Sequence, residues 1–423
     1  MLAPPSTLLW DGAALLRSRA AVAAGDPTLH AAVDQLRADA AMAYSLPLQS
    51  VTNKPHPPPG GDLHDYTSYS SYFWPCTAKC NTSLFANCTL WGPPPKTCNE
   101  TTGLPWVGRD GYNDPNSALD RPAWSAMLGA VNALAASTFF LNESAHAARA
   151  AALLRTWFLD NATAMRPAAT FAQAIPGRKT TPNLIDFSDG ADPGGGGNYD
   201  TTISLAHALD SARLLEWVAP DAWPATDRAA LTAWVREWLR WVASSSASTS
   251  EHAATNNIAL FYDTMLAAAS HFVGNASAVD AVCRAAPAAR VAVQVSPDGD
   301  LPAENRRTKS ESYHAFALTA LLDLAWICRA AAPAAPDLWA SETSDGRSVR
   351  GAVEWAAPFA DGRLPWTAGE QIRPFDATAY GRIYRAAAIG FAGDSERRFA
   401  AIAAKQPGAA ASREGLLRPY PSQ

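Results

Sequence analysis

The chain has 423 residues, of which 48% are hydrophobic and 17% charged, and its formal net charge is −5. This composition is typical of a globular protein with a large core and excludes a disordered chain. Because the net charge is negative, we expect no binding to nucleic acid or to an anionic membrane, and an anionic ligand would require a local basic patch. No run of about 18 apolar residues predicts a membrane span.

Cysteines and glycosylation sequons gather in one short window of the chain, residues 76–101. The window holds four of the six cysteines and three of the six Asn-X-Ser/Thr sequons. It predicts a secreted, glycosylated eukaryotic protein with two disulfides in the window. A zinc site is the alternative, although the spacing C-x3-C-x7-C-x9-C lacks paired C-x2-C knuckles. The window cysteines are Cys76, Cys80, Cys88 and Cys98, and the sequons begin at Asn81, Asn87, Asn99, Asn142, Asn161 and Asn275.

The two remaining cysteines, Cys283 and Cys328, each lie in a helical pattern. They form either a third disulfide or two free buried thiols. The first residues, MLAPPSTLLWDG, lack the basic and continuous apolar regions of a signal peptide. A mature chain with an added Met would reconcile this start with the predicted secretion.

Apolar residues recur every three to four positions through most of the chain, whereas alternating strand patterns are essentially absent. Most of the resulting helices are apolar on more than one face, so we expect them to pack on two sides. The predicted helices cover residues 29–46, 122–139, 143–159, 199–218, 226–244, 257–273, 277–293, 311–331, 348–357, 377–391 and 395–404.

Two irregular stretches interrupt the helices. Residues 47–116 are rich in Pro, Gly, Tyr and Cys, and a loop of this length is expected to be functional because its aromatic residues and disulfides argue against disorder. The segment DGADPGGGGNYD, which ends at Asp200, is expected to be a flexible surface insertion. Since no break in composition divides the chain, we predict one all-α domain over residues 1–423, an α/α toroid by analogy of fold, with an extended loop at 47–116.

Residues 294–330 combine a polar loop with a long apolar helix. Thr308 and Glu311 have the spacing of a capping box, which would place Arg307 just outside the helix and Tyr313 about one and a half turns inside it. Basic residues with a Tyr-His pair at a helix start suit an anionic ligand that undergoes proton transfer. The alternative is an ordinary surface loop before a core helix. Residues that could add to a basic patch here are Arg109, Arg178 and Lys179.

Four stretches together suggest a family. They are residues 50–75, with SVTNKPH, GGDLHDY and YFWP; residues 103–111, GLPWVGRDG; residues 255–263, TNNIALFYD; and residues 294–330. In this order, with AQAIPG at 172–177 and PFADGRLPW at 358–366, the chain resembles the alginate lyase family of polysaccharide lyases, in the broad branch that includes glucuronan lyases. The resemblance extends from about residue 50 to 391.

The resemblance implies β-elimination at a 4-linked uronic acid, within an α/α toroid and without an obligatory metal or other cofactor. The C5 proton is weakly acidic while the neighbouring carboxylate is charged, so donors must neutralise that carboxylate while a base and an acid act. In the family, an Asn and an Arg help to hold the carboxylate, and a Tyr serves as acid and often as base. By motif position these roles fall on Asn257, Arg307 and Tyr313.

Further substrate-binding candidates surround these three. Arg306 is the reserve for Arg307, and Asn256 stands beside Asn257 at a helix start, where backbone N–H groups favour anions. Several of these residues could instead have a purely structural role. The Asn pair could be a helix N-cap, Tyr313 a core residue, and Arg307 the surface partner of Glu304. The aromatic residues Tyr66, Tyr72 and Trp74 could serve only to pack the loop. Trp366 is expected in the core. The other candidates are His314, Tyr66, Tyr72, Trp74, Gln173, Lys54 and His64.

One position departs from the family pattern. Ile258 stands where the family usually has a His that assists with the carboxylate or serves as a base. Tyr313 would then carry both proton transfers from one side of the sugar, which fits mannuronate or glucuronate better than guluronate. His252 or His314 could substitute for the missing His. A protein that only binds polyuronate is the first alternative function.

We therefore predict a secreted, monomeric polysaccharide lyase that acts on an anionic β-1,4-linked polyuronate, such as glucuronan or polymannuronate. The product would carry a 4,5-unsaturated uronic acid. A glycoside hydrolase is the second alternative. It would need two carboxylates on either side of a sugar site. Nothing in their spacing pairs the available ones, which are Asp65, Asp110, Asp200 and Glu304.

Overall fold

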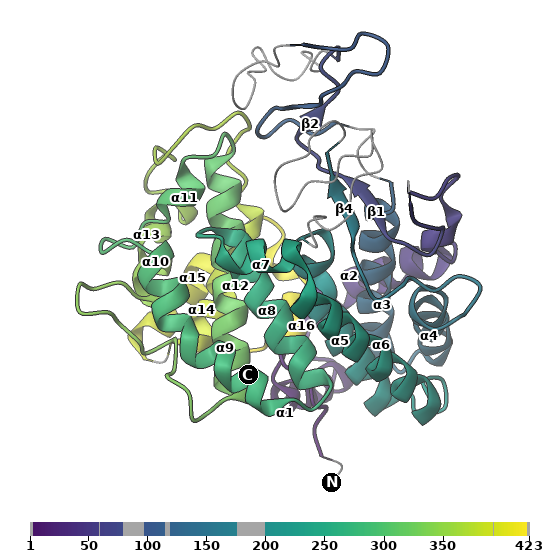
Figure 1. The fold of residues 1–423 in the computed structure, drawn as a ribbon. Coiled ribbons are helices and arrows are strands. Elements are labelled where there is room, and N and C mark those ends of the chain that lie inside the picture. Colours follow the sequence, from purple (N-terminus) through teal and green to yellow (C-terminus); the bar gives the residue numbers. More distant parts are fainter. Residues whose placement is uncertain are drawn as a thin grey trace.

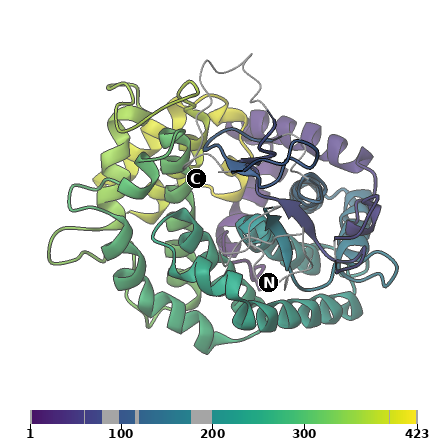
Figure 2. The same cartoon turned by 45° about the horizontal axis from the view of Figure 1, so that its top comes forward.

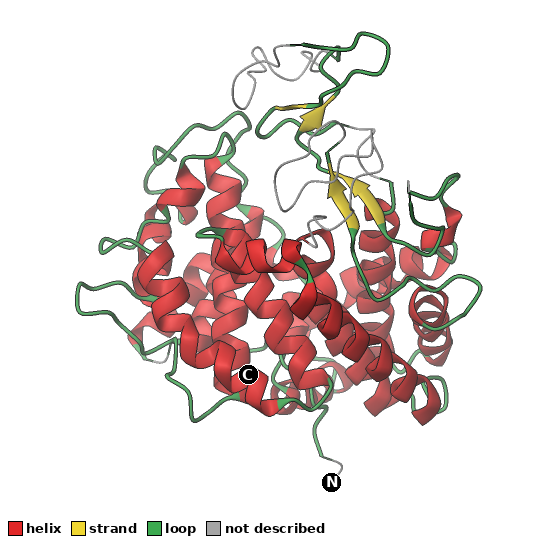
Figure 3. Ribbon diagram, in the orientation of Figure 1, coloured by secondary structure: helices red, strands yellow, loops and turns green. Residues whose placement is uncertain are grey.

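The computed structural model describes residues 3–58, 60–78, 97–114, 119–175, 199–391 and 393–420. Helices form most of the structure, and short strands lie together at one end of it (Figures 1 and 3). The all-α class and the toroid predicted from the sequence are confirmed.

Five helices form an inner series in which each contacts the next. They are α3 (Arg121–Leu141), α5 (Tyr199–Val218), α8 (Asn257–Phe272), α12 (Ser310–Ala331) and α14 (Thr378–Gly390). Helix α12 shows why their sequences are apolar on several faces, since it also contacts α9 and α13. By length and composition, α3 and α12 could each cross a membrane, yet 72% and 67% of their apolar windows are buried inside the protein.

The remaining helices cover this series from outside. Helices α2 and α4 pack on α3, helices α6, α7 and α9 pack on α8, and α13 and α15 pack on α14. Their bounds are α2 (His30–Ser45), α4 (Ser144–Phe158), α6 (Ala225–Ser244), α7 (Ser246–Ala253), α9 (Ala276–Ala286), α13 (Val349–Ala360) and α15 (Asp394–Lys405).

The chain ends close the ring. Helix α16 (Glu414–Leu417) contacts both α1 (Gly12–Ala23) and α2, and η5 (Ala409–Ala411) contacts α2 and α15. Next to this closure a cavity of about 370 Å³ lies between α3, α5 and the two chain ends. Its described lining, which includes Trp10, Gly129 and His207, contains none of the residues predicted as catalytic.

Most predicted helices match the observed ones within a few residues, but the helix expected at 277–293 is divided. Helix α9 gives way to a π-helical turn, Pro287–Val291, and then to α10 (Ala292–Gln294). Pro287 cannot donate a backbone hydrogen bond, which explains the break. The sequence did not predict α1, α7, α16 or α11 (Pro302–Asn305).

Four short strands fix the long loop at one end of the ring. Strand β1 (Thr67–Tyr69) pairs in parallel with β4 (Phe171–Ala174), and β2 (Phe73–Trp74) pairs antiparallel with β3 (Val107–Gly108). The strands are too short to produce an alternating pattern in the sequence. Figure 2, in which this end comes forward, shows them lying over the helices of the N-terminal half.

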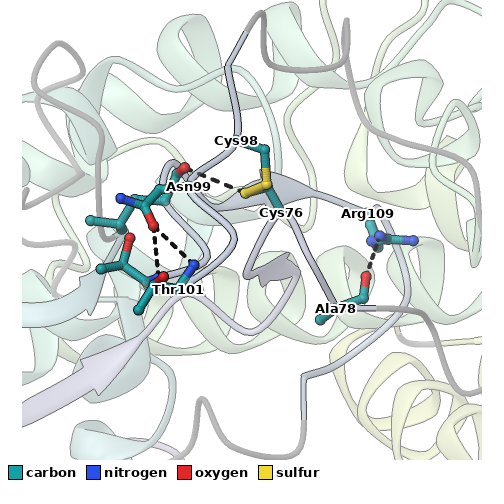
Figure 4. The surroundings of a disulfide bond; sticks show 8 residues. Cys76, Ala78, Cys98, Asn99, Thr101 and Arg109 are labelled. Atoms are coloured by element: carbon teal, nitrogen blue, oxygen red, sulfur yellow. Dashed lines mark hydrogen bonds between the residues drawn. A yellow bond between two sulfur atoms is a disulfide. The ribbon is translucent and has the colours of Figure 1, made fainter.

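Two disulfides are present among the described residues. Cys76 is bonded to Cys98, and near this bond the Arg109 Nη2 donates to the Ala78 carbonyl at 2.8 Å (Figure 4). The predicted partners Cys80 and Cys88 lie outside the described residues, as does the glycine-rich segment as far as residue 198. Cys283 is bonded to Cys328, which joins α9 to α12 and decides between the two alternatives.

Candidate active site

Tyr313 lies in the first turn of α12 and contacts Arg307 closely. The Arg307 Nη2 donates to the Tyr313 Oη at 2.8 Å, and the guanidinium carbon lies 3.8 Å from the centroid of the Tyr313 ring. Asp110 accepts from the Arg307 Nε at 3.1 Å and from its Nη2 at 2.5 Å. Asp110 therefore holds the guanidinium in place, and the guanidinium in turn orients the phenol.

The strands bring Tyr72 and Asp110 to this point together. Tyr72 immediately precedes β2, and its carbonyl accepts from the backbone N–H of Arg109, one residue before Asp110. The Tyr72 Oη and the Tyr313 Oη are 2.5 Å apart, so one hydroxyl donates to the other. Gly111 has a φ of +81°, and a Cβ there would come within 2.3 Å of the Thr308 Oγ1. The strand pair and this close approach thus complete a cluster of four side chains, Tyr72, Asp110, Arg307 and Tyr313, here called the Tyr313 cluster.

Burial and charge shift pKa values in opposite directions within the Tyr313 cluster. Burial lowers the pKa of Arg307, but the hydrogen bonds to Asp110 and the proximity of Tyr313 outweigh it, so the pKa is raised. Burial likewise raises the pKa of Asp110, yet Arg307 and Thr308 hold it below its ordinary value. For Tyr72 burial prevails over the contact with Tyr313 and raises the pKa, so its hydroxyl stays protonated.

The predicted capping box at the start of α12 is wrong. The Thr308 Oγ1 donates to the carbonyl of Asp110 at 2.9 Å, and Lys309 is the N-cap without a side-chain capping bond. The free N–H groups instead find partners in a distant loop: Ser310 N donates to the Glu370 carbonyl and Glu311 N to the Gln371 Oε1. A tertiary contact has replaced the local one, and it places Arg307 outside the helix as expected.

The asparagine pair is at the start of α8, but its amides have protein partners. The Asn256 Oδ1 caps the helix by accepting from Ile258 N at 3.3 Å. Asn257 is 1% exposed, and both its backbone N and its Nδ2 donate to the Glu304 carboxylate, at 2.6 and 2.7 Å. Burial raises the pKa of Glu304 despite these bonds. Substrate contact by Asn257 stays a prediction, and in this structure the residue holds Glu304.

Four predicted substrate-binding residues have buried side chains with partners inside the protein, and substrate contact by them stays a prediction. His314 is 0% exposed, with its Nδ1 3.1 Å from the Asn305 Oδ1 and its ring stacked on Trp355. Desolvation lowers its pKa to about 3, so it is neutral near pH 7, and its substitution for the missing family His stays a prediction. The others are Tyr66, which packs in the core; Trp74, whose Nε1 donates to the Tyr112 carbonyl; and Lys54, whose Nζ is paired with Asp120 at 2.8 Å.

The remaining candidates lie at or near the surface. Arg306 is exposed beside Arg307, while His64 and Gln173 are half-buried on the loop and on β4. Their substrate contacts stay predictions. His252 is exposed, and its Nδ1 is 3.0 Å from the Arg290 Nη2. Trp366 was expected in the core but is half-buried; its Nε1 donates to the Ser310 Oγ and its ring packs against Trp355, so it supports the start of α12.

Asp110 is the residue that the sequence did not assign to this chemistry. The motif GLPWVGRDG contributes to the family resemblance, but Asp110 is 197 residues from its partner Arg307, so no local pattern links the two. The expected surface pair of Arg307 with Glu304 does not form, because Glu304 is bonded to Asn257 instead. Among the described residues no group of three His, Cys, Asp or Glu side chains could hold a metal ion.

Comparisons with known proteins identify the family and the fold. A sequence model of the family described as alginate lyase matches residues 50–366. An alginate lyase structure from Bacteroides ovatus has 26% identity and a TM-score of 0.81, covering 98% of this chain and 99% of that chain. Two variants of alginate lyase A1-III complexed with a tetrasaccharide have 15% identity and TM-scores of 0.54 and 0.51, each covering 99% of this chain and 98% of its own; that enzyme is from a Sphingomonas species. No curated protein matches the chain.

Proposed function

Since the chain belongs to the alginate lyase family and is a polysaccharide lyase, we propose that it cleaves polymannuronate or glucuronan by β-elimination, with Tyr313 as the proton-transferring residue. The observation that carries this proposal is the pair of contacts at the Tyr313 Oη, one from the Arg307 guanidinium and one from the Tyr72 hydroxyl. Both groups can donate to a phenolate oxygen, and hydrogen bonds to an ionised group favour that form.

The reaction needs one proton removed and one delivered. The C5 proton moves to the Tyr313 phenolate, the C5–H electron pair forms the C4=C5 double bond, and the C4–O4 bond breaks. The departing O4 then receives a proton from the Tyr313 hydroxyl. Because burial keeps Tyr72 protonated, its hydroxyl is available to donate to the phenolate while Tyr313 is ionised.

A single tyrosine that performs both transfers restricts the substrate. It can serve only a sugar whose C5 hydrogen and O4 lie on the same side, which favours mannuronate and glucuronate over guluronate. Ile258, half-buried in the first turn of α8, offers no donor or acceptor that could act from the other side.

We further propose that the protein is secreted and glycosylated. Four of the predicted sequon asparagines fall within the described residues, and all four side chains are exposed: Asn99, Asn142, Asn161 and Asn275. The two disulfides support an oxidising compartment. Expression in a eukaryotic secretory host followed by glycosidase treatment would test this, and an unchanged mass would contradict it.

The activity is tested by incubating the protein with glucuronan, polymannuronate and polyguluronate and following the ultraviolet absorbance of the unsaturated product. We expect absorbance to rise with the first two. Products without a double bond would indicate a hydrolase instead. Binding measured by calorimetry without any product would select the alternative of a protein that only binds polyuronate.

Replacing Tyr313 with Phe removes the transferring oxygen and keeps the ring over Arg307. We expect the rate to fall by about 10³-fold or more, because general acid and base catalysis are lost together. Tyr44→Phe is the matched control, since Tyr44 is 47% exposed on α2. A Tyr313→Phe variant that keeps its rate would remove Tyr313 from this role.

A further inference from the structure

The cations of the site are not equally available to a substrate. Arg307 and Asp110 form an ion pair in which the guanidinium donates from both its Nε and its Nη2. Asp110 thus compensates much of the charge of Arg307, which also donates to the Tyr313 hydroxyl. Arg307 therefore positions the phenol, and a second cation beside it would add to the neutralisation of the substrate carboxylate.

Lys309 is a cation whose charge is not compensated in this way. Its side chain is 8% exposed, yet its Nζ makes no hydrogen bond or ion pair with any described residue. The Nζ lies 5.3 Å from the centroid of the Tyr72 ring. The charged groups around it are Arg373, Asp110 and Arg307, two of them cations. Asp110 is not within ion-pair distance of the Nζ, and an enclosed ammonium without an ion-pair partner is costly.

The backbone keeps Lys309 in this position. Lys309 is the N-cap of α12. Its backbone forms an isolated β-bridge with Gln371, which belongs to the loop that caps the helix. On the other side Gly111 approaches so closely that a Cβ there would come within 3.3 Å of the Lys309 Cε. The side chain is thus confined between two loops, next to the Tyr72–Tyr313 pair.

We propose that Lys309 binds and neutralises the carboxylate of the uronate whose C5 proton Tyr313 removes. This inference rests on the proposed function and adds a residue to its site. An ammonium beside the carboxylate stabilises the charge that develops as the C5 proton leaves, without itself exchanging a proton. The anion in turn supplies the partner that Lys309 lacks.

The pH dependence of the reaction follows from the same environment. Burial, together with Arg373, lowers the pKa of Lys309 to about 8. The ammonium must be protonated to bind a carboxylate, so kcat/KM should fall as the pH rises through about 8. Lys309→Arg keeps the charge and should move this fall to higher pH.

The decisive experiment compares wild type, Lys309→Met and Lys309→Arg on a polyuronate and on its methyl ester. On the acid, we expect kcat/KM to fall about 100-fold in Lys309→Met and to return to within tenfold in Lys309→Arg. On the ester, which has no carboxylate charge, wild type and Lys309→Met should differ less than threefold. Lys405→Met, on the exposed surface of α15, is the matched control.

Each other outcome overturns a distinct claim. An equal defect of Lys309→Met on acid and ester, or no defect on either, contradicts the inference about Lys309 alone. Activity that rises through pH 8 and is absent in Lys309→Arg would make Lys309 a base, which also contradicts it. Wild type inactive on every uronate would sink the proposed function and this inference with it. Melting temperatures guard against misfolding, and Lys309→Met should melt no lower than wild type because it removes an unpaired charge.

Discussion

Two clusters of charged side chains lie along helix α12, and they differ in whether their charges are paired. At the start of α12 lie the Tyr313 cluster and Lys309, whose Nζ has no anion within ion-pair distance among the described residues. Midway along it, Asp323 accepts from the Arg382 Nη2 at 2.6 Å and from the Arg418 Nη2 at 2.9 Å. The second group, here called the axial network, consists of His207, Asp323, Arg382, Glu414 and Arg418.

The charges of the axial network pair with one another, because its members come from the elements that complete the ring. Burial raises the pKa of Asp323, but Arg382 on α14 and Arg418 after α16 outweigh it and lower the pKa. Paired in this way, the charges fasten the C-terminal segment to the inner helices. Charges that satisfy each other hold a fold, whereas a buried charge left unpaired indicates a ligand.

The largest effect should come from opening the axial network. Asp323→Asn removes the carboxylate that Arg382 and Arg418 share and leaves them Glu414 alone, so we expect a loss of about 3–5 kcal/mol in the free energy of unfolding, measured by urea titration. Activity per folded molecule should change little. Asp337→Asn is the control, because Asp337 pairs with Arg329 at the surface and is 43% exposed. Equal losses in both variants would contradict the comparison.

Removing the carboxylate of the Tyr313 cluster should lower the reaction rate and not the stability. Asp110→Asn cannot hold Arg307 by two charge-assisted bonds, and the misplaced guanidinium no longer orients Tyr313. We expect kcat to fall about 10–100-fold, since small misplacements of a reacting group have effects of this size. The surface variant Asp345→Asn, which removes a carboxylate paired with Arg347, should keep full activity. An Asp110→Asn enzyme with an unchanged kcat would show that Arg307 does not depend on Asp110.

The smallest effect concerns pH. The pKa of His314 is about 3 in the folded protein and about 6.5 when unfolded, so below pH 6.5 the unfolded chain binds more protons. Stability contributed by neutral His314 is therefore present above pH 6.5 and is lost as the pH falls toward 3. Between pH 7 and pH 5 the loss is about 2 kcal/mol. His314→Asn should flatten the measured dependence by that amount, and an unchanged slope would mean that His314 is accessible to protons.

Much of the fold was predictable because helical periodicity is a local property. The start and end of α3, α5 and α6 were found within a few residues, and Arg307 and Tyr313 were assigned from a local motif. Cys283 and Cys328 were placed on helices, but their bond depends on how α9 meets α12. The same limit explains the capping box, in which Thr308 had a better partner in Asp110 than in its own helix.

The sequence by itself determined that the protein is all-α, which family it resembles, and that a tyrosine and an arginine stand together at the start of a helix. The tertiary structure alone decided which groups join them, since Asp110 lies 197 residues from Arg307 and Tyr72 lies 241 residues from Tyr313, and the β2–β3 pair brings them together. It also decided which candidates were buried, as His314, Tyr66 and Lys54 show. The physical reason is that charge compensation and burial depend on neighbours in space, which a local pattern cannot specify.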